Sequence, residues 1–229
     1  MKSLIFDAGP VISLATNNLL WVLEPLKKKF DGKFYITEAV RGELVDKPLE
    51  TKKFKFEAIQ VESLIEKGVL DVIDNNFIRE NSPRLLGTAN EIFKAYGNYM
   101  KIVHFAEMSV IAAAININSE AIVIDEKTTR FLIENPKLLV EILRKTLHTP
   151  ISINENNLKE FNNTVKNIKA IRSIEIVTIA YELGLLNNYI TKIADARKDL
   201  LEGVLWGLKL NGCAVSRDEI EQIVRIETK

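Results

Sequence analysis

The sequence predicts an α/β fold in which helices cover a central parallel sheet. Residues 4–6 and 121–124 are short, continuous apolar runs, as expected of strands buried on both faces of a parallel sheet. Longer helical patterns lie between and around these runs, which favours crossover connections between parallel strands. Both runs are followed directly by an aspartate, Asp7 or Asp125. The fold therefore predicts two carboxylates at strand ends.

The first part of the chain adds a strand and two helices to this sheet. "GKFYIT", residues 32–37, predicts a second strand. Thr37 is suited to cap the next helix, which carries Glu43. We expect Pro48 to end this helix, because proline lacks the backbone donor that a helix needs. Another helix is predicted near residues 57–67.

The middle of the chain has a weaker pattern. "VLDVID", residues 69–74, predicts a strand, and "NNFIRENSPRLLG", residues 75–87, is rich in turn-forming residues. "TANE", residues 88–91, has the Ser/Thr-x-x-Glu form of a capping box, which predicts the start of a helix. We interpret residues of about 50–100 as a segment inserted into the first domain.

A helix and a short strand follow the second apolar run. The helical pattern "NPKLLVEILRKTL" covers residues 135–147, and "ISI", residues 151–153, predicts a strand. Residues 154–168 are polar enough to form either a peripheral helix or a flexible segment.

The C-terminal tail is predicted to be helical. Apolar patterns begin at Ile171, and Gly212 is placed to end a helix. "SRDE", residues 216–219, has the capping-box form and predicts another helix start. We therefore predict a first domain over residues 1–149 and a mainly helical extension over residues 150–229 that packs on the core.

The composition narrows the classes of function. The chain has 229 residues, of which 47% are hydrophobic, and 31 Lys plus Arg balance 31 Asp plus Glu. Its overall charge therefore demands neither a nucleic acid nor an anionic membrane as a partner. The single cysteine excludes an internal disulfide framework and a cysteine-built zinc site. With no signal peptide or spanning segment in the pattern, we expect a soluble, cytoplasmic protein without a membrane partner.

The chemistry is predicted to lie at the strand ends. The carboxyl ends of parallel strands open a crevice, and both Asp7 and Asp125 occupy such ends. Two carboxylates in one crevice repel each other, so at least one takes up a proton unless a cation neutralises them. A hard divalent ion is the natural partner.

Glu107 strengthens this interpretation. In a helix through "HFAEMSVIAAAI", residues 104–115, Glu107 shares an apolar stripe with Val110 and Ile111. A buried carboxylate costs several kcal/mol unless it is paired, protonated or bound to a metal, and these three alternatives stay open. Asp7, Glu43, Glu107 and Asp125 offer oxygen donors only, which suits Mg²⁺ or Mn²⁺ better than zinc.

Several motifs resemble those of PIN-domain proteins, including the VapC-like toxins. "IFDAGPVISLA", "VRGEL", "AEMSVIAAAI" and "IVIDEKTTR" are similar to the successive acidic motifs of that family, and they are spread in order over residues 3–133. "VTIAYELGLLNNYI", residues 177–190, and "LNGCAVSRDEIEQIV", residues 210–224, resemble the tail of a prokaryotic PIN subgroup. The similarity thus extends to most of the chain.

This resemblance implies a three-layer fold and hydrolysis of RNA phosphodiesters by an activated water. It implies that Asp7, Glu107 and Asp125 hold Mg²⁺ or Mn²⁺, and that Glu43 binds an ion through water or positions the nucleophile. An antitoxin partner and a homodimer are implied in the same way. Four further residues are candidates for support or for substrate binding: Ser13, Glu126, Thr128 and Arg130.

The chain departs from the family pattern around its last acidic motif. Ile124 precedes Asp125 where many relatives carry a hydroxyl residue, and Glu126 follows where a second aspartate is frequent. Thr128 is the candidate for the missing hydroxyl. Two other functions stay open: a non-catalytic PIN scaffold for binding or assembly, and a nuclease directed at DNA.

Overall fold

The computed structural model describes residues 2–228. Its central sheet has five parallel strands in the order β3-β2-β1-β6-β8. Their bounds are β1 (Ser3–Phe6), β2 (Lys33–Thr37), β3 (Asp71–Ile73), β6 (Ala121–Val123) and β8 (Ala170–Ile171). The predicted α/β class with a central parallel sheet is confirmed. Because all five strands run in the same direction, their carboxyl ends lie at one edge.

The apolar run of β1 is explained by its central place in the sheet. Ile5 is paired with Tyr35 on one side and with Ile122 on the other. Ile5 and Phe6 are completely buried. A strand with neighbours on both edges and helices on both faces has no solvent side, which is why its residues do not alternate with polar ones.

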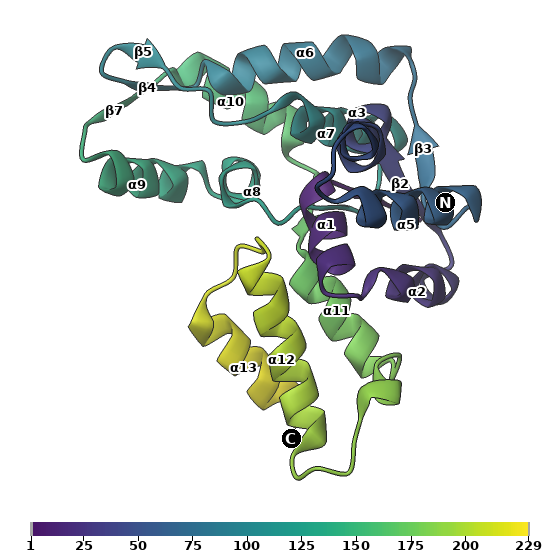
Figure 1. The fold of residues 1–229 in the computed structure, drawn as a ribbon. Coiled ribbons are helices and arrows are strands. Elements are labelled where there is room, and N and C mark those ends of the chain that lie inside the picture. The colour runs from purple at the N-terminus through teal and green to yellow at the C-terminus, as the bar shows by residue number, and fades with distance from the viewer. Residues whose placement is uncertain (1, 229) are drawn as a thin grey trace.

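Helices form a layer on each face of this sheet (Figure 1). On one face, α7 (Phe105–Ile117) packs against β1, β2 and β6. On the other, α2 (Leu23–Phe30) and α11 (Ser173–Glu182) line an apolar cavity of about 260 Å³ together with Leu4 and Phe34. The predicted three-layer arrangement is therefore present.

The segment after β2 corrects the prediction for Pro48. Thr37 does cap a helix, since its hydroxyl accepts a hydrogen bond from Val40 N at 3.3 Å. The helical run continues past Pro48 through α3 (Glu38–Arg41), the π-helical turn η2 (Gly42–Asp46) and α4 (Lys47–Glu50). Pro48 lies in the first turn of α4, where a missing N–H has little cost.

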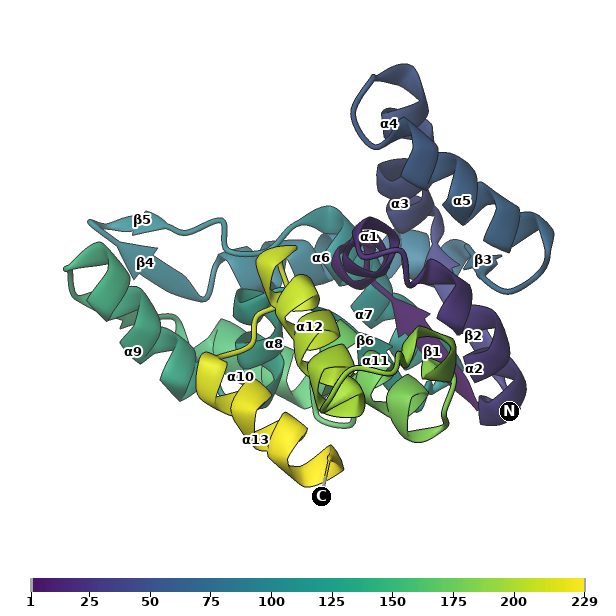
Figure 2. The same ribbon diagram turned by 60° about the horizontal axis from the view of Figure 1, so that its bottom comes forward.

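Helix α5 (Lys55–Glu66) follows α4 and packs against η2 and α1 (Ala8–Thr16). Figure 2 shows α4 and α5 projecting together from the rest of the molecule. The short 3₁₀ turn η1 (Leu20–Val22) leads from α1 toward α2. The predicted helix near residues 57–67 and the predicted strand within residues 69–74 are both present as α5 and β3.

The turn-rich stretch after β3 is a helix, so this expectation is wrong. Helix α6 (Asn76–Asn90) is capped by Asn75, whose side chain accepts a hydrogen bond from Ile78 N at 3.0 Å, and it includes Pro83. "TANE" lies at the end of α6 and does not begin a helix. One side of α6 buries Ile78 and Leu85 against α7, and this packing outweighs the local turn propensity.

A second, antiparallel sheet lies beside α9 at one end of the molecule (Figure 1). It contains β4 (Phe93–Ala95), β5 (Asn98–Tyr99) and β7 (Ile151–Ile153), in the order β5-β4-β7. The predicted strand "ISI" therefore exists but does not join the central sheet. Three helices surround this part of the chain: α8 (Lys127–Glu134), α9 (Pro136–Leu147) and α10 (Glu155–Val165).

The tail begins with a strand where helix was expected. Residues 170–171 form β8, and α11, η3 (Asn187–Tyr189), α12 (Ala196–Leu210) and α13 (Arg217–Glu227) follow. Gly212 has a φ of +113° just after α12, and Ser216 caps α13 as predicted. β8 extends the central sheet after residue 149, and the division of the chain at residues 149 and 150 stays a prediction. Among residues 2–228, no helix is long and apolar enough to cross a bilayer.

Candidate metal centre at the strand ends

Asp7 joins β1 to α1 at the carboxyl edge of the sheet. It is the N-cap of α1, and its Oδ2 accepts a hydrogen bond from Gly9 N at 3.4 Å. Only 6% of the residue is exposed. The pKa of Asp7 is raised to about 7, first by burial and then by the charges of Glu107 and Glu43, while the backbone N–H groups of Ala8 and Gly9 act in the opposite direction.

Glu107 lies in the first turn of α7, a helix in which every residue from Ala106 to Ala114 is buried. Its Oε2 accepts a hydrogen bond from His104 N at 2.7 Å, and the residue is 8% exposed. The pKa of Glu107 is raised to about 7, chiefly by burial and also by the charges of Glu126 and Glu43. The backbone of His104 and the hydroxyl of Thr129 oppose the shift. The helix does bury this carboxyl group, as its apolar stripe suggested.

Asp125 faces a different environment. Its Oδ1 accepts a hydrogen bond from Ser173 N at 2.7 Å, and its Oδ2 accepts from Ser173 Oγ at 2.7 Å and from Ser13 Oγ at 3.0 Å. A Cβ placed on Gly9 would lie 3.7 Å from Asp125 Cβ and 3.7 Å from Asp7 Oδ2. The two aspartates therefore flank the same glycine, on the same side of the sheet edge.

Glu43 and Glu126 lie at the border of this group. Glu43 is part of η2, its side chain is 40% exposed, and Lys47 Nζ lies 4.0 Å from its Oε1. Glu126 is exposed and caps α8, since its Oε2 accepts a hydrogen bond from Thr129 N at 2.6 Å. Both carboxylates nevertheless act on the pKa of Glu107.

The remaining predicted residues are in α8. Thr128 is half-buried in its first turn. Arg130 stacks on the ring of Phe131, with the guanidinium carbon 4.9 Å from the ring centre, and its Nη1 lies 4.0 Å from Glu134. The Nε of Arg130 is buried without a hydrogen-bond partner among the described residues.

The donor set fits a hard divalent cation. The charged groups that act most strongly on Asp7 and Glu107 are carboxylates, which are the donors that Mg²⁺ and Mn²⁺ prefer. The buried hydroxyl of Thr129 lies near Glu107 without meeting the geometry of a hydrogen bond within residues 2–228. A bound cation would relieve the repulsion between the two carboxyl groups.

The described residues contain no cluster of three or more Asp, Glu, His or Cys side chains arranged to hold a metal ion. This finding is compatible with Mg²⁺, because that ion keeps several waters and takes only one or two carboxylates from a protein. Asp7 and Glu107 are the pair whose burial and charge fit this role. The assignment of Asp125 as a further ligand stays a prediction.

Ser173 and Arg172 are residues at this edge that the sequence did not reveal. Both follow β8, which ends beside β6, and Ser173 is completely buried. The usable signal was the apolar pair Ala170 and Ile171 followed directly by polar residues, as the apolar runs 4–6 and 121–124 are followed by Asp7 and Asp125. The pair was too short to distinguish from the start of the next helix.

Cys213 also lies close to this group. It is buried, and burial raises the pKa of its thiol to about 12, with the charge of Asp125 as the second cause. A thiol with so high a pKa is protonated at neutral pH and is a poor metal ligand. Cys213 therefore packs as a small apolar side chain.

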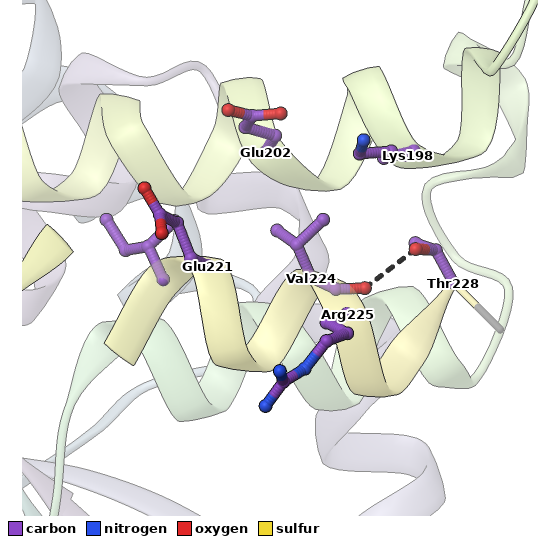
Figure 3. A pocket seen from close by; sticks show the side chains of 7 residues that line it. Lys198, Glu202, Glu221, Val224, Arg225 and Thr228 are labelled. Atoms are coloured by element: carbon purple, nitrogen blue, oxygen red, sulfur yellow. Dashed lines mark hydrogen bonds between the residues drawn. The ribbon is translucent and has the colours of Figure 1, made fainter. Parts of the chain in front are cut away.

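A larger groove, of about 580 Å³, lies elsewhere, between α12 and α13 (Figure 3). Lys198 and Glu202 of α12 and Glu221 and Arg225 of α13 are among the residues that line it. These charged side chains are exposed or half-buried, and the groove contains none of the predicted site residues. The candidate functional site is therefore at the carboxyl edge of the central sheet and not in this groove.

Comparison with known proteins identifies the family of this chain. A family model described as a PIN domain matches residues 3–141, which is more than half of the chain. Searches of curated proteins and of solved structures each found no match. PIN domains are in general nucleases, so the match indicates a nuclease-type function. Since the matched range contains the strands and helices that carry Asp7, Glu107 and Asp125, the chain belongs to the PIN-domain family.

Proposed function

We propose that this PIN domain is a divalent-metal-dependent ribonuclease that hydrolyses RNA phosphodiester bonds. The observation that carries the proposal is the pair Asp7 and Glu107, two buried carboxyl groups whose pKa values are both raised to about 7. Strongly shifted carboxyl groups at the carboxyl edge of a parallel sheet are typical of a functional site. Family membership supports hydrolysis of a nucleic acid over other reactions.

The residues have distinct roles in this proposal. Asp7 and Glu107 would hold Mg²⁺ or Mn²⁺, with Asp125 as the third ligand. When bound, such an ion supplies Lewis acidity toward water and a phosphate oxygen. Glu43, half exposed at the border, would orient the attacking water, and Arg130 would bind a phosphate through its planar guanidinium group. The apolar packing around Glu107 keeps bulk water away from its carboxyl group.

The projecting α4 and α5 provide a surface for a nucleic acid (Figure 2). Phe56 is 68% exposed and Phe54 is 37% exposed, and Lys53 Nζ lies 4.7 Å from the centre of the Phe54 ring. Exposed lysines at positions 47, 52 and 55 add positive charge. Aromatic rings interleaved with lysines suit the bases and phosphates of a single strand. The segment begins directly after η2, which carries Glu43.

The test is a cleavage assay with a metal titration. Labelled single-stranded RNA and DNA of the same sequence are incubated with the full chain at increasing Mg²⁺ or Mn²⁺. We compare wild type, Asp7→Asn and the control Glu120→Gln, an exposed acid before β6 at the opposite edge of the sheet. Metal-dependent RNA cleavage that Asp7→Asn abolishes and Glu120→Gln retains supports the proposal. RNA cleavage that is unchanged in Asp7→Asn contradicts it.

The comparison of RNA cleavage with DNA cleavage separates a ribonuclease from a DNA-directed nuclease. Preferential cleavage of DNA would replace the ribonuclease assignment by a DNA-directed nuclease. The toxin role, the antitoxin partner and the homodimer rest on the resemblance to VapC-like proteins alone. Growth arrest on expression of the wild type, but not of Asp7→Asn, would support the toxin role.

One observation favours the second candidate, a non-catalytic PIN scaffold. Asp125 already accepts three hydrogen bonds, from Ser173 N, Ser173 Oγ and Ser13 Oγ. A carboxylate with these partners is stable in the fold without a cation. Absence of both Mn²⁺ binding and cleavage in the wild type would favour this candidate.

A further inference from the structure

Ser173, which lies outside the range that the family model matches, contacts Asp125 twice. We propose that Ser173 is a positioning residue that orients the Asp125 carboxylate for a divalent cation. Its N–H and hydroxyl hold one oxygen each and leave one acceptor position of Oδ1 free. This inference rests on the proposed function, because it places Asp125 beside the cation of that site.

Hydrogen bonds occupy three of the acceptor positions of the Asp125 carboxylate. A carboxylate offers about four lone-pair positions, two on each oxygen. Oδ2 accepts from Ser173 Oγ at 2.7 Å and from Ser13 Oγ at 3.0 Å, while Oδ1 accepts from Ser173 N at 2.7 Å. These three hydrogen bonds leave one position of Oδ1, and the buried, protonated Cys213 thiol is a further group close to this carboxylate. Asp125 can offer a cation one oxygen without losing a hydrogen bond.

The position of Ser173 is fixed by the sheet. β8 is parallel to β6, with Val123 opposite Ile171, and Ile124 N donates to Ile171 O at 2.8 Å. Asp125 and Ser173 thus follow neighbouring strands at the same edge. Their contact is a consequence of strand register rather than of a flexible loop.

The hydroxyl of Ser173 is not used to cap a helix. Arg172 is the N-cap of α11, and its N–H is bonded by Glu175 Oε2 at 2.6 Å. Ser173 is completely buried, and its Oγ donates its hydrogen to Asp125. Ser173 donates two hydrogen bonds to the Asp125 carboxylate, one from its N–H and one from its hydroxyl. An alanine at this position would keep only the N–H donor.

A third part of the chain holds the backbone of Asp125. Ala214 N donates to Asp125 O at 3.2 Å, and Arg172 Nη1 donates to Ala214 O at 2.9 Å. Arg172 also bonds Glu219 of α13 at 3.0 Å. The region after residue 141 therefore fixes both the backbone and the side chain of Asp125.

The experiment measures Mn²⁺ binding to the full chain by calorimetry without nucleic acid, and kcat and KM for RNA cleavage separately. The variants are Ser173→Ala, Ser173→Thr, which keeps a hydroxyl, and Ser13→Ala, which removes the other Oδ2 donor. Ser82→Ala is the matched control, because Ser82 is also completely buried and its Oγ donates to Ile78 O in α6. The melting temperature in EDTA reports on folding.

Loss of an orienting partner of a metal ligand typically weakens metal affinity or activity about 10- to 100-fold. We expect Ser173→Ala to weaken Mn²⁺ binding and to lower kcat within that range, with KM nearly unchanged. Ser173→Thr should stay close to wild type. Ser82→Ala should keep its Mn²⁺ affinity even if its melting temperature falls. If Ser173→Ala does not fold, Ser13→Ala carries the test, with the same expected loss.

The Mn²⁺ affinities test the positioning role of Ser173, and the cleavage assay tests the proposed nuclease function. Mn²⁺ affinity equal to wild type in Ser173→Ala, or in Ser13→Ala where the first variant does not fold, overturns the positioning role, whatever the nuclease assay shows. A wild type that binds Mn²⁺ but cleaves neither RNA nor DNA overturns the proposed function, and the affinities of the variants still decide the role of Ser173. A wild type without Mn²⁺ binding overturns both.

Discussion

Asp7 and Glu107 are brought together by β1 and α7, and the charge of Glu107 is the second cause, after burial, of the raised pKa of Asp7. The two groups come from distant parts of the sequence, and neither has a cationic partner among the main influences on its pKa in the described chain. This pair of buried carboxyl groups should make the stability of the fold depend on pH and on divalent ions.

The first prediction concerns pH in the absence of metal. The folded-state pKa of Asp7 is about 7, above its ordinary value of 3.8, so the folded state keeps a proton that the unfolded state releases. The free energy of unfolding should therefore fall as pH rises from about 4 to about 7. The ionisation of Asp7 should lower the free energy of unfolding by on the order of 4 kcal/mol across that window.

Denaturant unfolding in EDTA between pH 5 and pH 8 checks this prediction. Asp7→Asn removes the group that titrates, so the variant should gain stability relative to wild type as pH rises. Glu120→Gln serves as the control and should follow the wild type. A difference between Asp7→Asn and wild type that does not depend on pH would contradict the prediction.

The second prediction concerns divalent ions at pH 8, where both carboxyl groups are mainly ionised in the folded protein. A cation that binds only the folded state adds about 2.7 kcal/mol to the free energy of unfolding at 100 times its Kd. Mn²⁺ should therefore raise the melting temperature of wild type and of Glu120→Gln, but not of Asp7→Asn. An equal rise in all three proteins would indicate binding elsewhere.

The third prediction concerns the ion pair between Arg172 and the last helix. Arg172 is 8% exposed, and although burial lowers its pKa, hydrogen bonds and charges of Glu175 and Glu219 raise that pKa above the ordinary value. Arg172→Met removes the donor to the half-buried Ala214 O and leaves Glu175 and Glu219 without their cation, so it should lower the free energy of unfolding by about 2 to 3 kcal/mol.

Arg217→Met is the matched control for this prediction. Arg217 bonds Glu221 at 2.6 Å, but its side chain is 74% exposed, so solvent screens the pair and its loss should change the stability far less than the loss of Arg172. Denaturant unfolding measures both losses. Hydrogen exchange at Ala214 N, which is bonded to Asp125 O, should accelerate in Arg172→Met only. Equal losses in the two variants would refute the special role of Arg172.

The fourth prediction concerns binding of a nucleic acid to α4 and α5. Phe56→Ala should weaken binding of a single-stranded RNA about tenfold, because stacking of a base on an aromatic ring contributes about 1 to 3 kcal/mol. Fluorescence anisotropy in EDTA measures affinity without cleavage. Tyr96→Ala is the control, since Tyr96 is 76% exposed between β4 and β5, apart from the strand ends. A larger effect of Tyr96→Ala would move the binding surface to that hairpin.

The sequence was sufficient for the central part of the fold. Apolar runs that end at Asp7 and Asp125 predicted two neighbouring parallel strands, because a strand buried on both faces has an unmistakable composition. The burial of Glu107 followed from the stripe of apolar residues around it. These features depend on the pattern of apolar residues within one short segment, so the sequence alone was enough to predict them.

Other features depend on contacts between distant segments. Pro48 was expected to end a helix, but η2 shifts the register so that Pro48 begins a new turn. Residues 75–87 have turn-forming residues, yet packing on α7 makes them part of α6. β8 has only two residues, and nothing in their identity shows that β6 is their neighbour. The partners of Asp125 were hidden for the same reason.

The late position of β8 and Ala214 in the chain has a consequence for synthesis on the ribosome. Asp7, Glu107 and Asp125 leave the exit tunnel well before the segments that secure Asp125 through Ser173 and Ala214. A partly made polypeptide therefore contains every acidic group but lacks the strand and the loop that hold one of them in place.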